Sequence, residues 1–150
     1  MNQLLAFAVQ ELLSLKVVFD TGSSTLEIPG ILCGEPCKNQ RSFNPSLSST
    51  FINGSESNTI TFGTGVGVTP VIGDNTQIDI QSAVDTISIG DLSVKNITFF
   101  LITNSTPVFA MDPFDGIMGL GTDPSSWLEG AINEGLAREP VSLLILRLLR

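Results

Sequence analysis

A single aspartate stands between an apolar run and a group of small residues near the start of the chain, in V-V-F-D-T-G-S-S over residues 17–24. A carboxylate is almost never fully buried unless another group pairs with it. Asp20 therefore either occupies an exposed turn or lies among groups arranged around its charge. In the second case its carboxyl could serve as an acid or a base.

The chain contains no histidine. This excludes a Ser-His-Asp triad, a Cys-His nucleophile and any metal site that uses histidine. Chemistry must therefore depend on carboxylates, hydroxyls or the backbone. The two cysteines, Cys33 and Cys37, cannot complete a four-ligand structural zinc site. They either bond to each other across a Gly-Glu-Pro loop or remain free thiols, and we favour the local disulfide.

With 150 residues the chain has the length of one domain and can bury a core. Seven basic residues against 15 acidic ones give a net charge of -8. A surface of that sign does not attract nucleic acid or an anionic membrane, so neither partner is expected. No apolar stretch is long enough to span a bilayer.

The sequence favours an extracellular, secreted protein, with the vacuole as the alternative. A disulfide requires an oxidising compartment. Three N-x-S/T triplets make Asn53, Asn96 and Asn104 candidates for glycosylation. The N-terminus gives no support, because residues 1–16 lack a basic start and a small-x-small cleavage site.

The pattern of the chain predicts an all-β lobe with a few short helices. Ser, Thr, Asn, Gly, Val and Ile dominate its middle and favour strands. Spacing predicts a helix over residues 3–15, turns at 63–65 and 90–91, and a helix capped by Ser125 or Ser126 that extends to Leu136. Short strands are expected at 25–28, 59–62, 77–80, 86–89 and 94–101.

The D-T-G-S-S run at 20–24 resembles the active-site loop of the pepsin-like aspartic proteases, in particular secreted fungal-type members. Later segments resemble the same family, in the same order, over about residues 16–137. They are F-N-P at 43–45, S-S-T-F at 48–51, I-T-F-G-T-G at 60–65, D-T-I-S-I-G at 85–90 and F-D-G-I-M-G-L-G at 114–121. The three glycines of the last segment require backbone to approach backbone closely.

The resemblance implies endopeptidase chemistry on polypeptides at acidic pH, between bulky apolar residues and with no metal or organic cofactor. In this family two D-T-G loops bring two aspartates around one water, and the pair shares a proton. Asp20 is then one half of the dyad. Thr21 braces the loop, Gly22 turns its amide toward the carboxylate, and Ser23 hydrogen-bonds the outer carboxylate oxygen.

The resemblance also places the substrate-binding flap, the hairpin that closes over the cleft, at Phe62, Gly63 and Thr64. Two positions depart from the family. Phe62 stands where tyrosine is usual, because the chain has no tyrosine, and Glu27 stands where an aromatic is usual. The segment between Gly65 and Asp85 is longer than in pepsin, and we expect it to extend the strands beside the flap.

Only one D-T-G occurs in the chain. The sequence therefore resembles an N-terminal lobe at 16–137, between an atypical N-terminal segment at 1–15, where a helix replaces the family's opening strands, and an atypical apolar tail at 138–150. That tail is either a strand that packs on a missing lobe or a membrane-surface helix. Three functions stay open: half of an enzyme whose C-terminal lobe is missing, a homodimer that builds one dyad from two copies of Asp20, or an inactive peptide-binding lobe.

Overall fold

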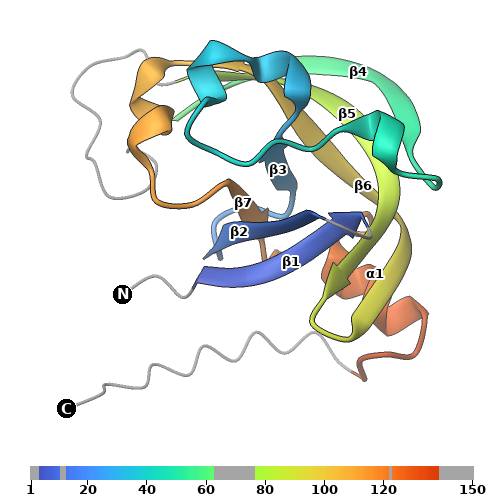
Figure 1. The fold of residues 1–150 in the computed structure, drawn as a ribbon. Coiled ribbons are helices and arrows are strands. Elements are labelled where there is room, and N and C mark those ends of the chain that lie inside the picture. Colours follow the sequence, from blue (N-terminus) through green and yellow to red (C-terminus); the bar gives the residue numbers. More distant parts are fainter. Residues whose placement is uncertain (1–3, 11–12, 63–76, 122, 139–150) are drawn as a thin grey trace.

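The computed structural model describes residues 4–10, 13–62, 77–121 and 123–138 as a curled sheet with short helices at its ends (Figure 1). The strands are β1 Leu4–Gln10, β2 Leu13–Asp20, β3 Leu26–Pro29, β4 Ile52–Thr61, β5 Gln77–Ile89, β6 Leu92–Ser105 and β7 Gly116–Gly119. One α-helix, α1 Trp127–Asn133, accompanies the 3-10 helices η1 Ile31–Cys33, η2 Glu35–Cys37, η3 Pro45–Leu47 and η4 Pro107–Met111. The predicted all-β class is confirmed.

The seven strands form one mixed sheet in the order β1-β2-β7-β3-β6-β5-β4. β7 lies between β2, to which it is parallel, and β3, to which it is antiparallel. β1 pairs with β5 as well as with β2, so the sheet curls back on itself. The late strand β7 is thus inserted between two strands that are close together in the sequence and joined by the D-T-G loop.

The sheet has a core on each face. On one face lies the larger core, which includes Leu26 and Ile28 of β3. Successive side chains of a strand point to opposite faces, so Glu27 points to the other face. That face carries a smaller core of Cys33, Cys37, Ile78, Ile80 and Ile102, with Phe62, Phe100 and Phe109 packed against it.

Long strands replace several of the predicted short ones. The predicted strands at 77–80 and 86–89 are parts of the continuous β5, and the residues between them are buried or partly buried. The longer segment before Asp85 therefore extends the flap-side strands from Gln77 onward, as expected. The predicted turn at 90–91 is confirmed, since β5 pairs with β6 on either side of it and Gly90 has a φ of 59°.

The helix predicted over residues 3–15 is wrong. In its described part, residues 4–10 form β1 and residues 13–15 belong to β2, so the family's opening strands are present. A short apolar run fits a buried strand as well as a helix, and pairing partners decide between them. Here β1 pairs in antiparallel register from Leu4↔Val18 to Gln10↔Leu13 and meets β5 at Phe7↔Ile89, and these long-range pairings override the local helix preference.

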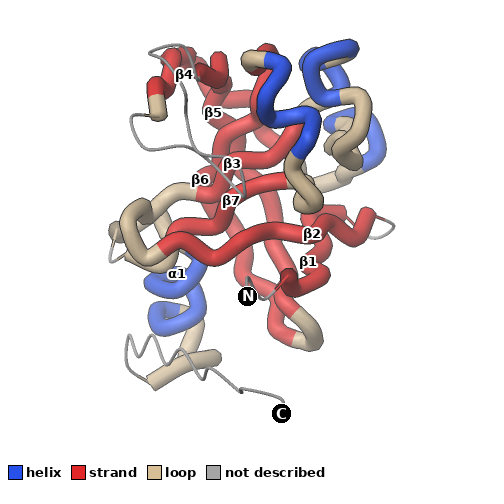
Figure 2. The backbone as a smooth tube through the Cα atoms, turned by 90° about the vertical axis from the view of Figure 1, so that its left-hand side faces the viewer, coloured by secondary structure: helices blue, strands red, loops and turns tan. Residues whose placement is uncertain are grey.

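The predicted C-terminal helix and the local disulfide are both confirmed. Ser126 caps α1 by accepting a hydrogen bond from the Glu129 amide, although α1 ends at Asn133, short of Leu136. Trp127 Nε1 donates to the Ile87 carbonyl at 2.8 Å and fastens α1 to β5. Cys33 and Cys37 form a disulfide that joins η1 to η2, and these helices lie with η4 at the end of the sheet away from α1 (Figure 2).

Several predictions fall on residues outside the described part of the chain. They are the turn at 63–65 with the flap residues Gly63 and Thr64, the rest of the long segment up to residue 76, and the apolar tail beyond residue 138. Within the described residues, no helix has the length and apolar character needed to cross a membrane.

We predict that Gly119→Ala destabilises the fold by about 1–3 kcal/mol, the usual cost of overpacking. A Cβ on Gly119 would lie 2.5 Å from the Ser23 carbonyl carbon and 2.6 Å from its oxygen, and this backbone cannot rotate away. Gly30→Ala is the matched control, because its Cβ would meet Leu101 at an ordinary 3.4 Å. Urea unfolding should show a lower midpoint for Gly119→Ala alone, and equal midpoints would contradict the prediction.

Candidate active site

Asp20 is the last residue of β2 and its side chain is half-buried. The Gly22 amide donates a hydrogen bond to Asp20 Oδ1 at 2.9 Å. This is the amide orientation that the resemblance implied, and it removes the burial problem of Asp20. One backbone amide orients this carboxyl, and within the described residues its other oxygen remains open to a further partner.

Backbone hydrogen bonds from the end of β7 hold the loop that follows Asp20. The amides of Gly119, Leu120 and Gly121 donate in turn to the carbonyls of Thr25, Asp20 and Ser23, at 2.7, 2.8 and 2.9 Å. These bonds fix the loop at its start, middle and end. The position of Asp20 therefore depends on a segment about 100 residues later in the chain.

The other two loop residues make fewer contacts than the resemblance implied. Thr21 is exposed, and its hydroxyl has no hydrogen bond within the described residues. The Ser23 hydroxyl oxygen is buried and also lacks a partner there, so the bond to the outer oxygen of Asp20 is not formed in this structure. A buried hydroxyl without a partner is costly, and Ser23 is therefore available to a group that enters the site.

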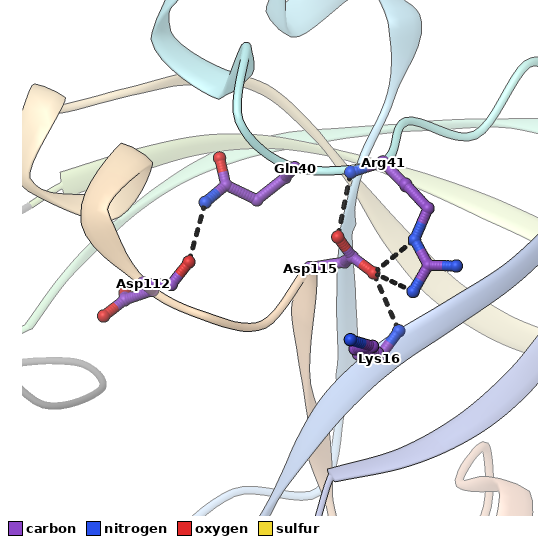
Figure 3. Close-up of polar contacts among 5 residues, drawn as sticks. All are labelled: Lys16, Gln40, Arg41, Asp112 and Asp115. Carbon is purple, nitrogen blue, oxygen red and sulfur yellow. Dashed lines mark hydrogen bonds and ion pairs between the residues drawn. The ribbon is translucent and has the colours of Figure 1, made fainter.

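Asp115, just before β7, anchors the other end of that strand (Figure 3). Its Oδ2 accepts the Lys16 amide at 2.8 Å and Arg41 Nε at 3.0 Å, and its Oδ1 accepts the Arg41 amide at 2.9 Å. Gln40 beside it donates to the carbonyls of Phe109 and Asp112. The sequence placed Asp115 in a glycine-rich segment but gave no sign of this anchoring role, because its partners come from two distant segments.

Glu27 is a buried carboxyl on the same face of the sheet as Asp20. Asp20 on β2 pairs with Gly119 on β7, and the Gly119 amide donates to the Thr25 carbonyl. Glu27 lies on β3, two residues after Thr25. Only 5% of its surface is exposed, and Thr25 Oγ1 donates to Glu27 Oε1. Burial raises the pKa of Glu27, and the charge of Asp20 raises it further, while the Thr25 bond opposes both effects.

Phe62, the residue at the flap position, packs edge-on against Phe109 of η4 with ring centroids 5.4 Å apart. It is partly buried beside the smaller core, which lies on the Asp20 face of the sheet. An aromatic side chain therefore occupies this position without a hydroxyl. Its contact with substrate stays a prediction.

No second aspartate joins Asp20 within the described residues. Asp85 is 1% exposed and lies on the face of the larger core, between Ala83 and Ile87, where it accepts the Thr50 hydroxyl and the Thr86 amide. Asp115 uses both oxygens in its anchoring contacts. Over the same residues, no three acidic, cysteine or histidine side chains gather as metal ligands.

All three glycosylation candidates are exposed. Asn96 has a left-handed φ of 56°, which asparagine tolerates better than most residues. The Asn104 amide nitrogen donates to Asp79 Oδ2 at 3.0 Å. Modification of these residues stays a prediction.

Comparison with known proteins shows the family of this chain. The family model described as eukaryotic aspartyl protease matches residues 11–133. The chain belongs to this family and represents a pepsin-like lobe that carries one D-T-G loop.

Individual relatives are pepsins of mammals and fungi. Pepsin A of Suncus murinus is 36% identical over an alignment of 132 residues that covers 80% of this chain and 32% of the relative. Pepsin A of Bos taurus is 37% identical over 80% of this chain and 33% of its own length. Rhizopuspepsin-4 of Rhizopus niveus is 31% identical over 86% of this chain and 32% of its own length. The chain thus spans about a third of these relatives, and a fungal-type origin stays a prediction.

We predict that Glu27→Gln weakens the pH dependence of stability. Because the folded-state pKa of Glu27 lies above its ordinary value of 4.5, the folded chain retains this proton longer than the unfolded chain. The resulting stabilisation is complete below 4.5 and is lost as pH rises through the folded-state pKa. Wild type should therefore lose stability relative to Glu27→Gln as pH rises through this window.

Urea unfolding over a series of pH values measures this difference. The exposed Glu56→Gln removes one charge of the same type and serves as the control, with a curve parallel to that of wild type. Parallel curves for wild type and Glu27→Gln would contradict the burial argument.

Proposed function

We propose that this chain is one lobe of an aspartic-type endopeptidase and carries one of its two catalytic aspartates. The observation that supports this most strongly is the loop of Asp20, with a backbone amide on one carboxylate oxygen and three backbone bonds from residues 119–121. Family membership agrees with it. Polypeptides are the proposed substrate.

The proposed reaction needs two carboxyl groups with different protonation. The ionised aspartate takes a proton from a water molecule, and this water attacks the peptide carbonyl carbon. The protonated aspartate donates its proton to the carbonyl oxygen. Two carboxyls that lie so close cannot both be charged, and the pair therefore titrates as a unit.

Other loop residues of this chain have supporting roles in the proposal. The Gly22 amide fixes the orientation of the Asp20 carboxyl. The buried Ser23 hydroxyl takes its missing partner from the assembled site. The exposed Thr21 hydroxyl bonds to the corresponding loop of the second lobe.

The second aspartate comes either from a C-terminal lobe or from a second copy of this chain. Relatives three times as long supply a reason for the first source. In the second case two copies pair about a two-fold axis and bring two Asp20 side chains together, so activity depends on protomer concentration.

A catalytically inactive peptide-binding lobe is the second candidate. β4 is an edge strand of the sheet, and most of its residues are exposed. Such a strand can pair with an extended peptide through its backbone. This function needs Asp20 neither as an acid nor as a base.

The disulfide between Cys33 and Cys37 supports a secreted or vacuolar location, because such bonds persist in oxidising compartments. Exposed Asn53, Asn96 and Asn104 are compatible with glycosylation there. A vacuolar location would also supply the acidic pH that the proposed reaction needs.

We predict that the chain cleaves a denatured protein at about pH 4 only when a second copy or a C-terminal lobe supplies the other aspartate, because a carboxyl pair then shares one proton. The rate should be measured over about a hundredfold range of chain concentration, because assembly of two copies follows mass action. Asp20→Asn is the control, since it keeps the size of the side chain and removes the acid.

Specific activity that rises with concentration and disappears in Asp20→Asn indicates a dyad built from two copies. No cleavage at any concentration, with cleavage restored by a C-terminal lobe, indicates half of an enzyme. Equal cleavage by wild type and Asp20→Asn would contradict the proposed function.

A further inference from the structure

A cavity of about 590 Å³ opens on the Asp20 face of the sheet. Its apolar wall consists of Ile60, Ile80 and Phe100, from three neighbouring strands, and its polar wall consists of residues 55–58 and Thr25. Phe100 pairs directly with Glu27, and Thr25 lies beside Gly119, the partner of Asp20. The cavity therefore extends from Thr25, just before β3, to β4, and its Thr25 end lies two strands from Asp20. One extended peptide can reach both places.

A β-bulge presents Glu56 to this cavity. The register of β4 against β5 shifts between Asn53 and Ser57, so the intervening residues lack regular partners. Two bonds hold the bulge: the Glu56 amide donates to Ser82 Oγ at 3.1 Å, and Gln81 Nε2 donates to the Gly54 carbonyl at 3.0 Å. Glu56 lies among the residues that line the cavity, on the same face of β4 as Asn58 and Ile60.

Thr25 presents an acceptor at the inner end of the cavity. A threonine hydroxyl has one proton and two lone pairs. Its proton goes to Glu27 Oε1, so the lone pairs of Thr25 remain for a donor that enters the cavity. Behind this hydroxyl stands a carboxyl that is 5% exposed.

Neither acid has a cationic partner within the described residues. The ion pairs there join Lys38 to Glu35 and Arg41 to Asp115. A buried carboxylate is normally paired with a positive charge. The charge of Asp20, which has the same sign, acts on Glu27 and raises its pKa. The direct partners of Glu27 on β6 and β7, Phe100 and Ile117, carry no charge. A cation from outside would remove this imbalance.

We propose that the cavity is a subsite for a basic side chain, lysine or arginine, of an extended peptide. The ammonium or guanidinium group donates to Thr25 Oγ1 and is balanced by Glu27 behind it and by Glu56 at the rim. The alkyl stem of the side chain packs on Ile60, Ile80 and Phe100. This inference rests on the proposed peptide-binding cleft and specifies which side chain one part of it selects. Apolar preference at other subsites is compatible with it.

Binding of two series of octapeptides tests the proposal. Each peptide carries lysine, or norleucine with the same alkyl chain and no charge, at one position of an otherwise identical alanine-valine sequence. Calorimetry with the wild-type chain at about pH 6.5 avoids any need for catalysis, and a cationic ligand favours the charged form of Glu27. We expect lysine to bind about tenfold or more tightly than norleucine at one position.

Variants assign the preference to the cavity. Glu27→Gln and Thr25→Val should each reduce the lysine preference to about threefold or less, because each removes part of the charged contact. Asp91→Asn removes an exposed charge from the turn between β5 and β6 and should leave the preference unchanged.

Three other outcomes would each contradict the basic subsite or the peptide cleft. If norleucine and lysine peptides bind equally at every position, the basic subsite is wrong while the peptide cleft stands. If neither series binds, the peptide cleft of this chain is wrong as well. A lysine preference that survives in both Glu27→Gln and Thr25→Val places the contact elsewhere and overturns the proposal.

Discussion

The packing of β7 between β2 and β3 is the constraint on which the rest of the structure depends. The amides of its last residue and of the two residues that follow hold the Asp20 loop at three points, and its two terminal positions leave no room for a side chain. A Cβ on Gly116 would lie 2.3 Å from the Glu27 carbonyl oxygen, just as one on Gly119 would meet Ser23. Asp115 then ties the start of β7 to β2 and to the loop of Arg41. The acid at the end of β2 is thus positioned by residues about 100 positions later, and the glycine segment serves the site without any chemistry of its own.

Three carboxyl groups of the chain have different roles because their surroundings differ. Asp20 is half-buried, accepts a backbone amide and pairs with Gly119, which has no side chain. These surroundings are suited to a reacting carboxyl. Asp115 is held by an arginine and two amides and is structural. Glu27 is buried with one hydroxyl as its partner, so its protonation is coupled to folding and to any cation that approaches. The face around Asp20 therefore carries both the proposed catalytic acid and the proposed selective charge.

The sequence was sufficient for features that depend on local residue chemistry. D-T-G at 20–22, the Gly90 turn, the Ser126 cap and the close approach at 116–121 each follow from a residue type in a short pattern. Features that depend on distant partners were not predictable. Residues 4–10 have a composition that suits a helix, and only pairing with β2 and β5 makes them a strand. The same limit applies to Asp115, whose partners are far away in sequence, and to Ser23, whose expected bond is absent. Glu27 was visible only as a departure from an aromatic position, because its burial arises from β6 and β7 together.

The central claim is that a single lobe with one aspartate is not sufficient for catalysis. Peptide hydrolysis by wild-type chains tethered to beads so sparsely that no two copies meet tests it most directly, at about pH 4. We expect no hydrolysis by isolated chains. Hydrolysis should appear when free wild-type chain or a C-terminal lobe is added. It should not appear when free Asp20→Asn chain is added to pair with the tethered copies. Hydrolysis by isolated wild-type chains that disappears in tethered Asp20→Asn would contradict the claim, because one lobe would then supply both acid and base.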